Sequence, residues 1–254
     1  MKSFIKNLIR KKGSGLVRYS LESSEAFPDF DQADFHLINR VQRFTLTSPE
    51  RIFALIRAVE YVENSNIPGD IVECGVWRGG SIMVVASTLL RLGKTDRHLY
   101  LFDTFEGMTE PTEHDISFAG AKASDLLRRR IHRRGDTTNP ICADAPLDQV
   151  RESVLSIGYD ANKIHFVKGR VEDTIPEISP ERVSLLRLDT DWYESTRHEL
   201  IHLFPRLSTG GVIIIDDYGH WQGAKRAVDE YLQENRIGLL LNRIDYTGRI
   251  GIKY

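Results

Sequence analysis

The sequence is short of cysteine, of long apolar stretches and of net charge, and each shortage excludes a class of protein. Its 254 residues contain two cysteines, Cys74 and Cys142, too few for a disulfide scaffold. No apolar run approaches the roughly 18 residues of a transmembrane helix, and no secretory signal peptide is recognisable. The formal net charge of −2 disfavours nucleic-acid binding through bulk positive charge. We therefore expect a cytoplasmic protein without a membrane span or a nucleic-acid partner.

Apolar runs rich in branched side chains alternate with segments of helical periodicity. The predicted strands are Asp70–Cys74, His98–Phe102, Lys163–Lys168, Val183–Leu188 and Val212–Ile215. The predicted helices are Pro49–Asn64, Gly79–Leu92, Ala121–His132, Leu147–Ile157, Ser195–Phe204 and Gly223–Asn235. This alternation predicts an α/β fold with a doubly wound, mostly parallel sheet covered by helices on both faces.

The two ends of the chain add to this core. Two short runs, Leu239–Ile244 and Arg249–Tyr254, predict an antiparallel hairpin at the sheet edge. Residues 67–254 then form a Rossmann-like domain, and residues 1–66 form an N-terminal helical cap and lid on the same structural domain. The length suits one large α/β domain, and no linker rich in proline or glycine divides it.

The first twenty residues carry only basic charges, with apolar residues at helical spacing between them. One interpretation is a short amphipathic helix that packs on a partner subunit or over the active site. The other is a membrane-surface helix. We favour the first because the pattern ends at Gly13-Ser14-Gly15 after about three turns, and we expect a homo-oligomer. A second basic run, residues 128–134, is typical of a solvated helix face.

Four aspartates follow two of the predicted strands. Asp189 and Asp191 come after Val183–Leu188, and Asp216 and Asp217 directly follow the strand that ends at Ile215. Parallel strands deliver their carboxyl ends to one edge of the sheet, where ligands bind. Carboxylates gathered there repel one another unless a cation lies between them. An all-oxygen set of ligands suits Mg²⁺ or Ca²⁺.

A glycine-rich turn follows the first predicted strand. Its glycines are Gly75, Gly79 and Gly80, and Glu73 precedes them, unlike the dinucleotide pattern G-x-G-x-x-G. An acid beside the turn suits a ligand with a cationic group better than a pyrophosphate. Asp103 ends the next strand, where an acid accepts hydrogen bonds from ribose hydroxyls. A plain βα turn and a helix N-cap explain each feature alone, but together they favour a nucleoside ligand.

These residues resemble a known family. The motifs are Val72–Ser81 (VECGVWRGGS), Phe102–Met108 (FDTFEGM), Leu188–Thr196 (LDTDWYEST) and Gly210–Gly219 (GGVIIIDDYG). They are similar to class I S-adenosylmethionine-dependent methyltransferases. More narrowly, they resemble the macrocin O-methyltransferase family, which methylates sugar hydroxyls of antibiotics. The resemblance covers roughly residues 35–254.

The resemblance implies two cofactors, S-adenosyl-L-methionine and Mg²⁺. It assigns the metal to Asp189, Asp216 and Asp217. The implied donor-binding residues are Glu73, Gly75, Ser81, Asp103 and Thr104, with Arg170 and Val171 at the adenine and Thr45 at the methionine end. Family members differ most in the segments that would meet the acceptor, so the resemblance does not name it.

The implied reaction is O-methylation of a small hydroxylated acceptor, a deoxysugar of a glycosylated natural product or another sugar. A metal lowers the pKa of an alcohol and a carboxylate removes its proton. Asp189 is the first candidate for this catalytic base, Asp191 the second, and His220 a further alternative. Nearby aromatic residues either wall the acceptor pocket or belong to the core: Trp192, Tyr193, Tyr218 and Trp221. The competing functions are an NAD-dependent oxidoreductase on a similar sheet and a non-catalytic scaffold.

Overall fold

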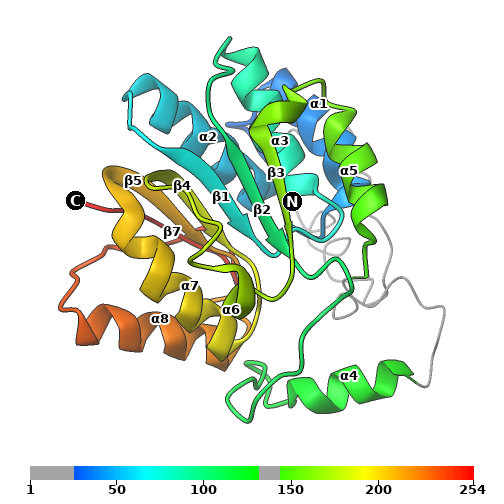
Figure 1. Ribbon diagram of the computed structural model, residues 1–254, viewed down its shortest axis with the longest axis vertical. Coiled ribbons are helices and arrows are strands. Elements are labelled where there is room, and N and C mark those ends of the chain that lie inside the picture. The colour runs from blue at the N-terminus through cyan, green and yellow to red at the C-terminus, as the bar shows by residue number, and fades with distance from the viewer. Residues whose placement is uncertain (1–25, 132–143) are drawn as a thin grey trace, which may run out of the picture.

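The computed structural model describes residues 26–131 and 144–254. The basic N-terminal segment, Cys142 and residues 132–134 of the basic run lie outside these ranges. A seven-stranded sheet with the order β3-β2-β1-β4-β5-β7-β6 forms the centre (Figure 1). Its strands are β1 (Asp70–Cys74), β2 (Leu99–Asp103), β3 (Ile164–Lys168), β4 (Val183–Leu188), β5 (Leu207–Ile215), β6 (Asn242–Arg243) and β7 (Arg249–Ile252). Strands β1 to β5 pair in parallel and β7 is antiparallel, which confirms the predicted fold class.

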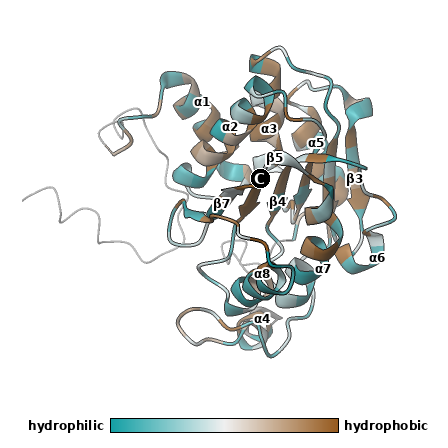
Figure 2. Cartoon of the chain, turned by 90° about the vertical axis from the view of Figure 1, so that its left-hand side faces the viewer, coloured by the Kyte–Doolittle hydropathy of each residue, from teal (hydrophilic) through white to brown (hydrophobic). Residues whose placement is uncertain are grey.

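Helices cover both faces of the sheet (Figure 1). They are α1 (Gln32–Val41), α2 (Pro49–Asn64), α3 (Gly80–Arg91), α4 (Ala123–Ile131), α5 (Leu147–Leu155), α6 (Val171–Thr174), α7 (Tyr193–Leu203) and α8 (Gln222–Glu234). Alternate residues of each strand enter opposite cores. Ile214 lies in the core under α2 and α3, and its neighbour Ile213 in the core under α7 and α8. Figure 2 shows the resulting sandwich, with hydrophobic strands between helices.

Helix α2 begins where the sequence predicted. The Ser48 hydroxyl accepts a hydrogen bond from the backbone N–H of Arg51 at 3.2 Å, and Pro49 occupies the first helical position. Ile52 and Val59 are buried in the same core as the strands. Helix α2 therefore packs directly on the sheet.

No helix in the described part of the chain is long and apolar enough to cross a membrane.

Strand β5 begins earlier than predicted and the hairpin is shorter. Leu207 pairs with Val183, but Val212 pairs with Leu185, so extra residues bulge out of β5. Gly210 in this bulge has a φ of 82°. A glycine is typical of a turn as well as of a bulge, so the sequence predicted that the strand begins only after it. Strand β6 contains only Asn242–Arg243.

The strand order reverses between β1 and β4, which places a crevice at their carboxyl ends. Gly75 directly follows β1 there with a φ of +83°, and a Cβ on it would lie 2.0 Å from the backbone oxygen of Asp189. The close approach of the loop after β4 therefore requires a glycine at this position, whether or not a ligand is bound. Likewise, a Cβ on Gly80 would lie 2.6 Å from the backbone oxygen of Phe44. The segment with Thr45 thus crosses the start of α3 in direct contact.

We expect Gly75→Ala to destabilise the protein by about 2–4 kcal/mol, because a left-handed backbone and a backbone clash act together. Gly158→Ala is the matched control. Its φ is +88° and nothing lies within 4 Å of the added methyl group, so it should cost only about 1 kcal/mol. Urea unfolding of both variants measures the difference. Equal losses would contradict the close approach of the two turns.

Candidate active site

A cavity of about 310 Å³ opens at the carboxyl edge of the parallel strands. This volume lies at the lower end of the range for small-molecule sites. Most of the predicted site residues line it: Thr45, Gly75, Ser81, Asp103, Thr104, Arg170, Val171, Asp189, Asp191, Asp216 and Asp217. Glu73 does not. The residues expected for the donor and those expected for the metal therefore share one cavity.

Three carboxylates in this cavity approach one another closely. Asp189, Asp191 and Asp217 each offer one oxygen, and these atoms lie within 4.8 Å of one another. Asp191 has a φ of 69°, so the loop after β4 turns through the left-handed region to present it. Burial raises the pKa of Asp191 to about 7 and raises those of Asp189 and Asp217 well above their ordinary values. The buried Oδ2 of Asp217 has no hydrogen-bond partner.

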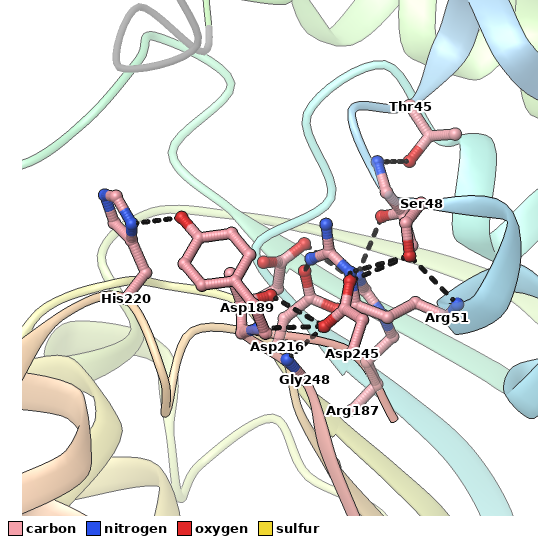
Figure 3. A network of polar contacts seen from close by, with 12 residues as sticks. Thr45, Ser48, Arg51, Arg187, Asp189, Asp216, His220, Asp245 and Gly248 are labelled. Carbon is pink, nitrogen blue, oxygen red and sulfur yellow. Dashed lines mark hydrogen bonds and ion pairs between the residues drawn. The ribbon is translucent and has the colours of Figure 1, made fainter. Parts of the chain in front are cut away.

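Asp216 has different partners. Its Oδ1 accepts a hydrogen bond from Arg187 at 2.8 Å, and its Oδ2 pairs with the guanidinium of Arg51. The group able to hold a metal in this conformation thus contains Asp191 where the resemblance implied Asp216. Arg51 also pairs with Asp245 at 3.0 Å, and the Ser48 hydroxyl donates to the same carboxylate at 2.8 Å (Figure 3).

Arg187 is the buried centre of this network (Figure 3). Its side chain is 4% exposed, and it lies beside Glu73 in the register of β1 and β4. Its Nη1 donates to Glu73 and Asp189 at 2.7 Å each, and its Nη2 donates to Asp216 at 2.8 Å and to Thr47 at 3.2 Å. Burial opposes its charge, but the three acids raise the pKa of Arg187 well above its ordinary value.

Glu73 thus lies outside the cavity lining, against Arg187. Burial raises the pKa of Glu73 to about 7, even though Arg187 acts in the opposite direction, and its second oxygen, Oε2, has no partner. The sequence held a signal for this pair, since an arginine inside the apolar run of β4 requires a buried acid nearby. The sequence analysis missed both Arg187 and Arg51.

Asp103 organises the donor end of the cavity. Its Oδ2 accepts hydrogen bonds from the backbone N–H groups of Val76 and Trp77 at 2.7 and 2.9 Å. Its Oδ1 accepts from the backbone of Phe105 at 2.7 Å. The carboxylate thus joins the glycine turn after β1 to the turn after β2. The Thr104 hydroxyl also lies 3.4 Å from Oδ1, but its single proton is donated to the carbonyl of Gly107 at 2.6 Å. A carboxylate has about four acceptor positions, so one is left for a ligand hydroxyl.

The aromatic residues near the acids divide between core and cavity. Trp192 and Trp221 are 2% and 3% exposed and pack edge to face, although Trp221 also reaches the cavity. The hydroxyls of Tyr193 and Tyr218 donate to Glu230 and Asp229 of α8, each at 2.6 Å. These three contacts hold α7, α8 and their loops together.

His220 lines the cavity, and its Nδ1 shares a hydrogen bond with the hydroxyl of Tyr246 (Figure 3). Burial lowers the pKa of His220, so the ring is neutral near pH 7. Tyr246 is a further cavity residue that the sequence analysis missed. It comes from the loop between β6 and β7, and only the packing of that loop against Gly219 reveals its position.

Comparison with known proteins identifies the family. The family model of macrocin-O-methyltransferase (TylF) matches residues 36–250. The chain belongs to this family. The predicted family and the predicted enzyme class, an O-methyltransferase, are confirmed, and the oxidoreductase alternative is set aside.

Three curated relatives cover 80% of the chain, and the match spans 73–76% of their own lengths. The 8-demethyl-8-(2,3-dimethoxy-alpha-L-rhamnosyl)-tetracenomycin-C 4'-O-methyltransferase of Streptomyces olivaceus is 37% identical over 205 residues. The demethyldecarbamoylnovobiocin O-methyltransferase of Streptomyces niveus is 33% identical. The mycinamicin III 3''-O-methyltransferase of Micromonospora griseorubida is 30% identical. Among solved structures, the O-methyltransferase NovP aligns with a TM-score of 0.70 and 31% identity, covering 83% of this chain and 82% of NovP.

The raised pKa of Glu73 predicts a specific pH dependence of stability. Its value is about 7 in the folded protein against an ordinary value of 4.5, so the folded state binds more protons between these pH values. The contribution of Glu73 to stability therefore falls as the pH rises through this window. We expect the unfolding free energy of Glu73→Gln to depend less on pH from about 4.5 to 7 than that of the unaltered protein. If the unfolding free energies of the two proteins changed in parallel with pH, the raised pKa of Glu73 would be contradicted.

Proposed function

We propose that the protein is an S-adenosyl-L-methionine- and Mg²⁺-dependent O-methyltransferase that acts on a hydroxyl of a deoxysugar in a glycosylated natural product or of another sugar. The main support is that one cavity contains both the donor turn, with Gly75 and Asp103, and the acids Asp189, Asp191 and Asp217. The rhamnosyl group in the name of the Streptomyces olivaceus relative supports a glycosylated acceptor. A cytoplasmic location and a homo-oligomer remain part of this proposal.

The donor end of the cavity suits S-adenosyl-L-methionine. Gly75, Ser81 and Thr104 line it beside Asp103, whose free acceptor position suits a ribose hydroxyl. Arg170 and Val171 lie after β3, where an adenine would rest, and Thr45 crosses the start of α3. We propose that Glu73 supports this site from below, through Arg187.

The acids fit a hard divalent cation. All three offer oxygen, the ligand atom that Mg²⁺ prefers, and the buried Oδ2 of Asp217 lacks any other partner. We propose that Asp189 and Asp217 hold the ion, since they belong both to the group seen here and to the set implied by the resemblance. Asp191 completes the group in this conformation. Asp216 would join it only if Arg51 withdrew, because its oxygens are taken by two arginines.

When bound, Mg²⁺ would orient the acceptor hydroxyl and lower its pKa. We propose Asp191 as the residue that takes the hydroxyl proton. Asp189 already accepts a hydrogen bond from Arg187 at 2.7 Å, which disfavours its taking a further proton. The donor turn and the segment around Thr45 would fix the sulfonium, so that oxygen, methyl carbon and sulfur align.

We expect Asp217→Asn to weaken Mg²⁺ binding by about 100-fold or more, because a buried oxygen ligand loses its charge. Calorimetric titration of the metal measures this, with Asp96→Asn as control, since that acid is fully exposed. Binding by the unaltered protein should tighten as the pH rises towards about 7, where Asp191 loses its proton. Unchanged affinity in Asp217→Asn would contradict the proposed site.

We expect Asp191→Asn to lower the rate of methyl transfer by about 10²–10⁴-fold, because the proton acceptor is lost. The assay follows the labelled methyl group from S-adenosyl-L-methionine to a glycoside acceptor, with and without a chelator. Binding of S-adenosylhomocysteine should stay unchanged, which shows that the donor end is intact. Turnover unaffected by both the substitution and the chelator would refute the proposed mechanism.

A further inference from the structure

Two loops that carry the acids of the cavity lead into neighbouring helices. Asp191 lies in the loop between β4 and α7, and Asp217 lies in the loop between β5 and α8. We name these two segments the acid loops. Helices α7 and α8 lie side by side on one face of the sheet (Figure 1). The position of each helix start therefore affects the position of the acid in front of it.

The acid loops need a restraint that opposes the repulsion between their carboxylates. Asp189, Asp191 and Asp217 offer oxygens within 4.8 Å of one another, and such groups repel whenever they are ionised. Asp191 also has a left-handed φ of 69°. A residue other than glycine keeps this conformation only where its surroundings impose it. Contacts at the two helix starts are in a position to supply this restraint.

One buried carboxylate, that of Asp115, lies at both helix starts. It comes from the loop between β2 and α4 and is 1% exposed. Its Oδ1 accepts a hydrogen bond from the backbone N–H of Tyr193, the first residue of α7, at 2.8 Å. A Cβ on Gly223, near the start of α8, would lie 2.1 Å from the same oxygen. The carboxylate of Asp115 therefore bridges the two helices.

The loop that carries Asp115 makes further contacts with the same helix starts. The indole N–H of Trp192, which directly precedes α7, donates to the carbonyl of Thr109 at 3.0 Å. The backbone N–H of Gln222, the first residue of α8, donates to the carbonyl of Ile116 at 2.9 Å. Asp115 is thus the side chain at the centre of a set of contacts that joins one loop to both helices.

The charge of Asp115 is a second influence on the acid loops. Burial is the main cause of the raised pKa of Asp191, and the negative charge of Asp115 adds to it. Position and charge are separable, because Gly223 touches the carboxylate without carrying a charge of its own. A change at Gly223 moves the bridge and leaves the net charge as it is.

We propose that Asp115 is a positioning residue for the metal site, which sets the separation of Asp191 and Asp217 by bridging the starts of α7 and α8. This inference rests on the proposed function and adds a residue that does not line the cavity. Asp115 is not itself a candidate ligand. Its Oδ1 accepts from Tyr193, and its Oδ2 accepts from the backbone N–H and the hydroxyl of Thr112 at 2.7 and 3.0 Å.

Calorimetric titration of the full chain with Mg²⁺ tests this proposal. We expect Asp115→Ala to weaken Mg²⁺ binding by about 10–100-fold, the usual loss when a group that orients metal ligands is removed. Asp115→Asn should lose less, because it keeps one oxygen for the N–H of Tyr193 although it places a donor against Thr112. Binding of S-adenosylhomocysteine should stay unchanged in both variants, which shows that they are folded.

Gly223→Ala separates position from charge. The added methyl group would displace the carboxylate of Asp115, whereas alanine is otherwise favourable in a helix. We expect a loss of Mg²⁺ affinity similar to that of Asp115→Ala. The double variant should lose little more than either single variant, because the two changes disrupt one contact. Without the Asp115 carboxylate, the nearest atom to the methyl group is the carbonyl oxygen of His114 at 3.2 Å.

Asp31→Ala is the matched control. The side chain of Asp31 accepts from the backbone N–H of Asp34 at 2.8 Å at the start of α1, so this change removes a helix cap that does not line the cavity. It should lower the midpoint of urea unfolding and leave the Mg²⁺ affinity as it was.

Three results would overturn the positioning role of Asp115. They are unchanged Mg²⁺ affinity in Asp115→Ala or Gly223→Ala, an equal loss in Asp31→Ala, and a loss of S-adenosylhomocysteine affinity as large as the loss for Mg²⁺. Failure of the proposed function is a different result, namely that the unaltered protein binds no Mg²⁺, and the inference then fails with it. If the unaltered protein binds Mg²⁺ and the variants bind it equally well, only the inference fails.

Discussion

The site depends on one buried cation, the guanidinium of Arg187. Strand β4 carries it into an interior where an unpaired charge would be very costly, and three carboxylates offset that cost. The same contacts fix Glu73 at the end of β1, Asp189 after β4 and Asp216 after β5. A single side chain thus links the carboxyl ends of three neighbouring strands, β1, β4 and β5. The carboxylates of Asp189, Asp191 and Asp217 can then lie close together at the ends of these strands.

Much of the fold follows from local patterns. Helix α2 follows from Ser48, Pro49 and its apolar spacing, and the parallel sheet follows from strands that alternate with helices. The bulge in β5 was not predictable, because Gly210 is equally compatible with a turn and with a strand that continues past it. The register that pairs Leu207 with Val183 is decided by long-range contacts.

The residues of the candidate site also fall into two groups, those that local sequence patterns predict and those that only long-range packing brings to the cavity. Residues at strand ends, such as Asp103 and Asp189, were found because a parallel sheet delivers them to one edge. Arg51 and Tyr246 were not found, since each reaches the cavity from a segment whose position depends on the packing of the whole domain. Glu73 was assigned to the donor from its place in the motif, yet it lies against Arg187 and outside the cavity lining. A motif identifies residues that belong together but does not give the direction in which each side chain points.

The contact of Ser48 and Arg51 with Asp245 has a consequence for how the protein is made. The Ser48 and Asp245 side chains are separated by 197 positions in the chain, yet they share a hydrogen bond at the cavity wall. Translation runs from the amino end, so the hairpin of β6 and β7 leaves the ribosome after all the other helices and strands described here. During synthesis, Arg51 therefore has no contact with Asp245 until the hairpin has been made. The cavity, which Tyr246 and Thr247 also line, cannot be completed on a nascent chain that lacks these residues.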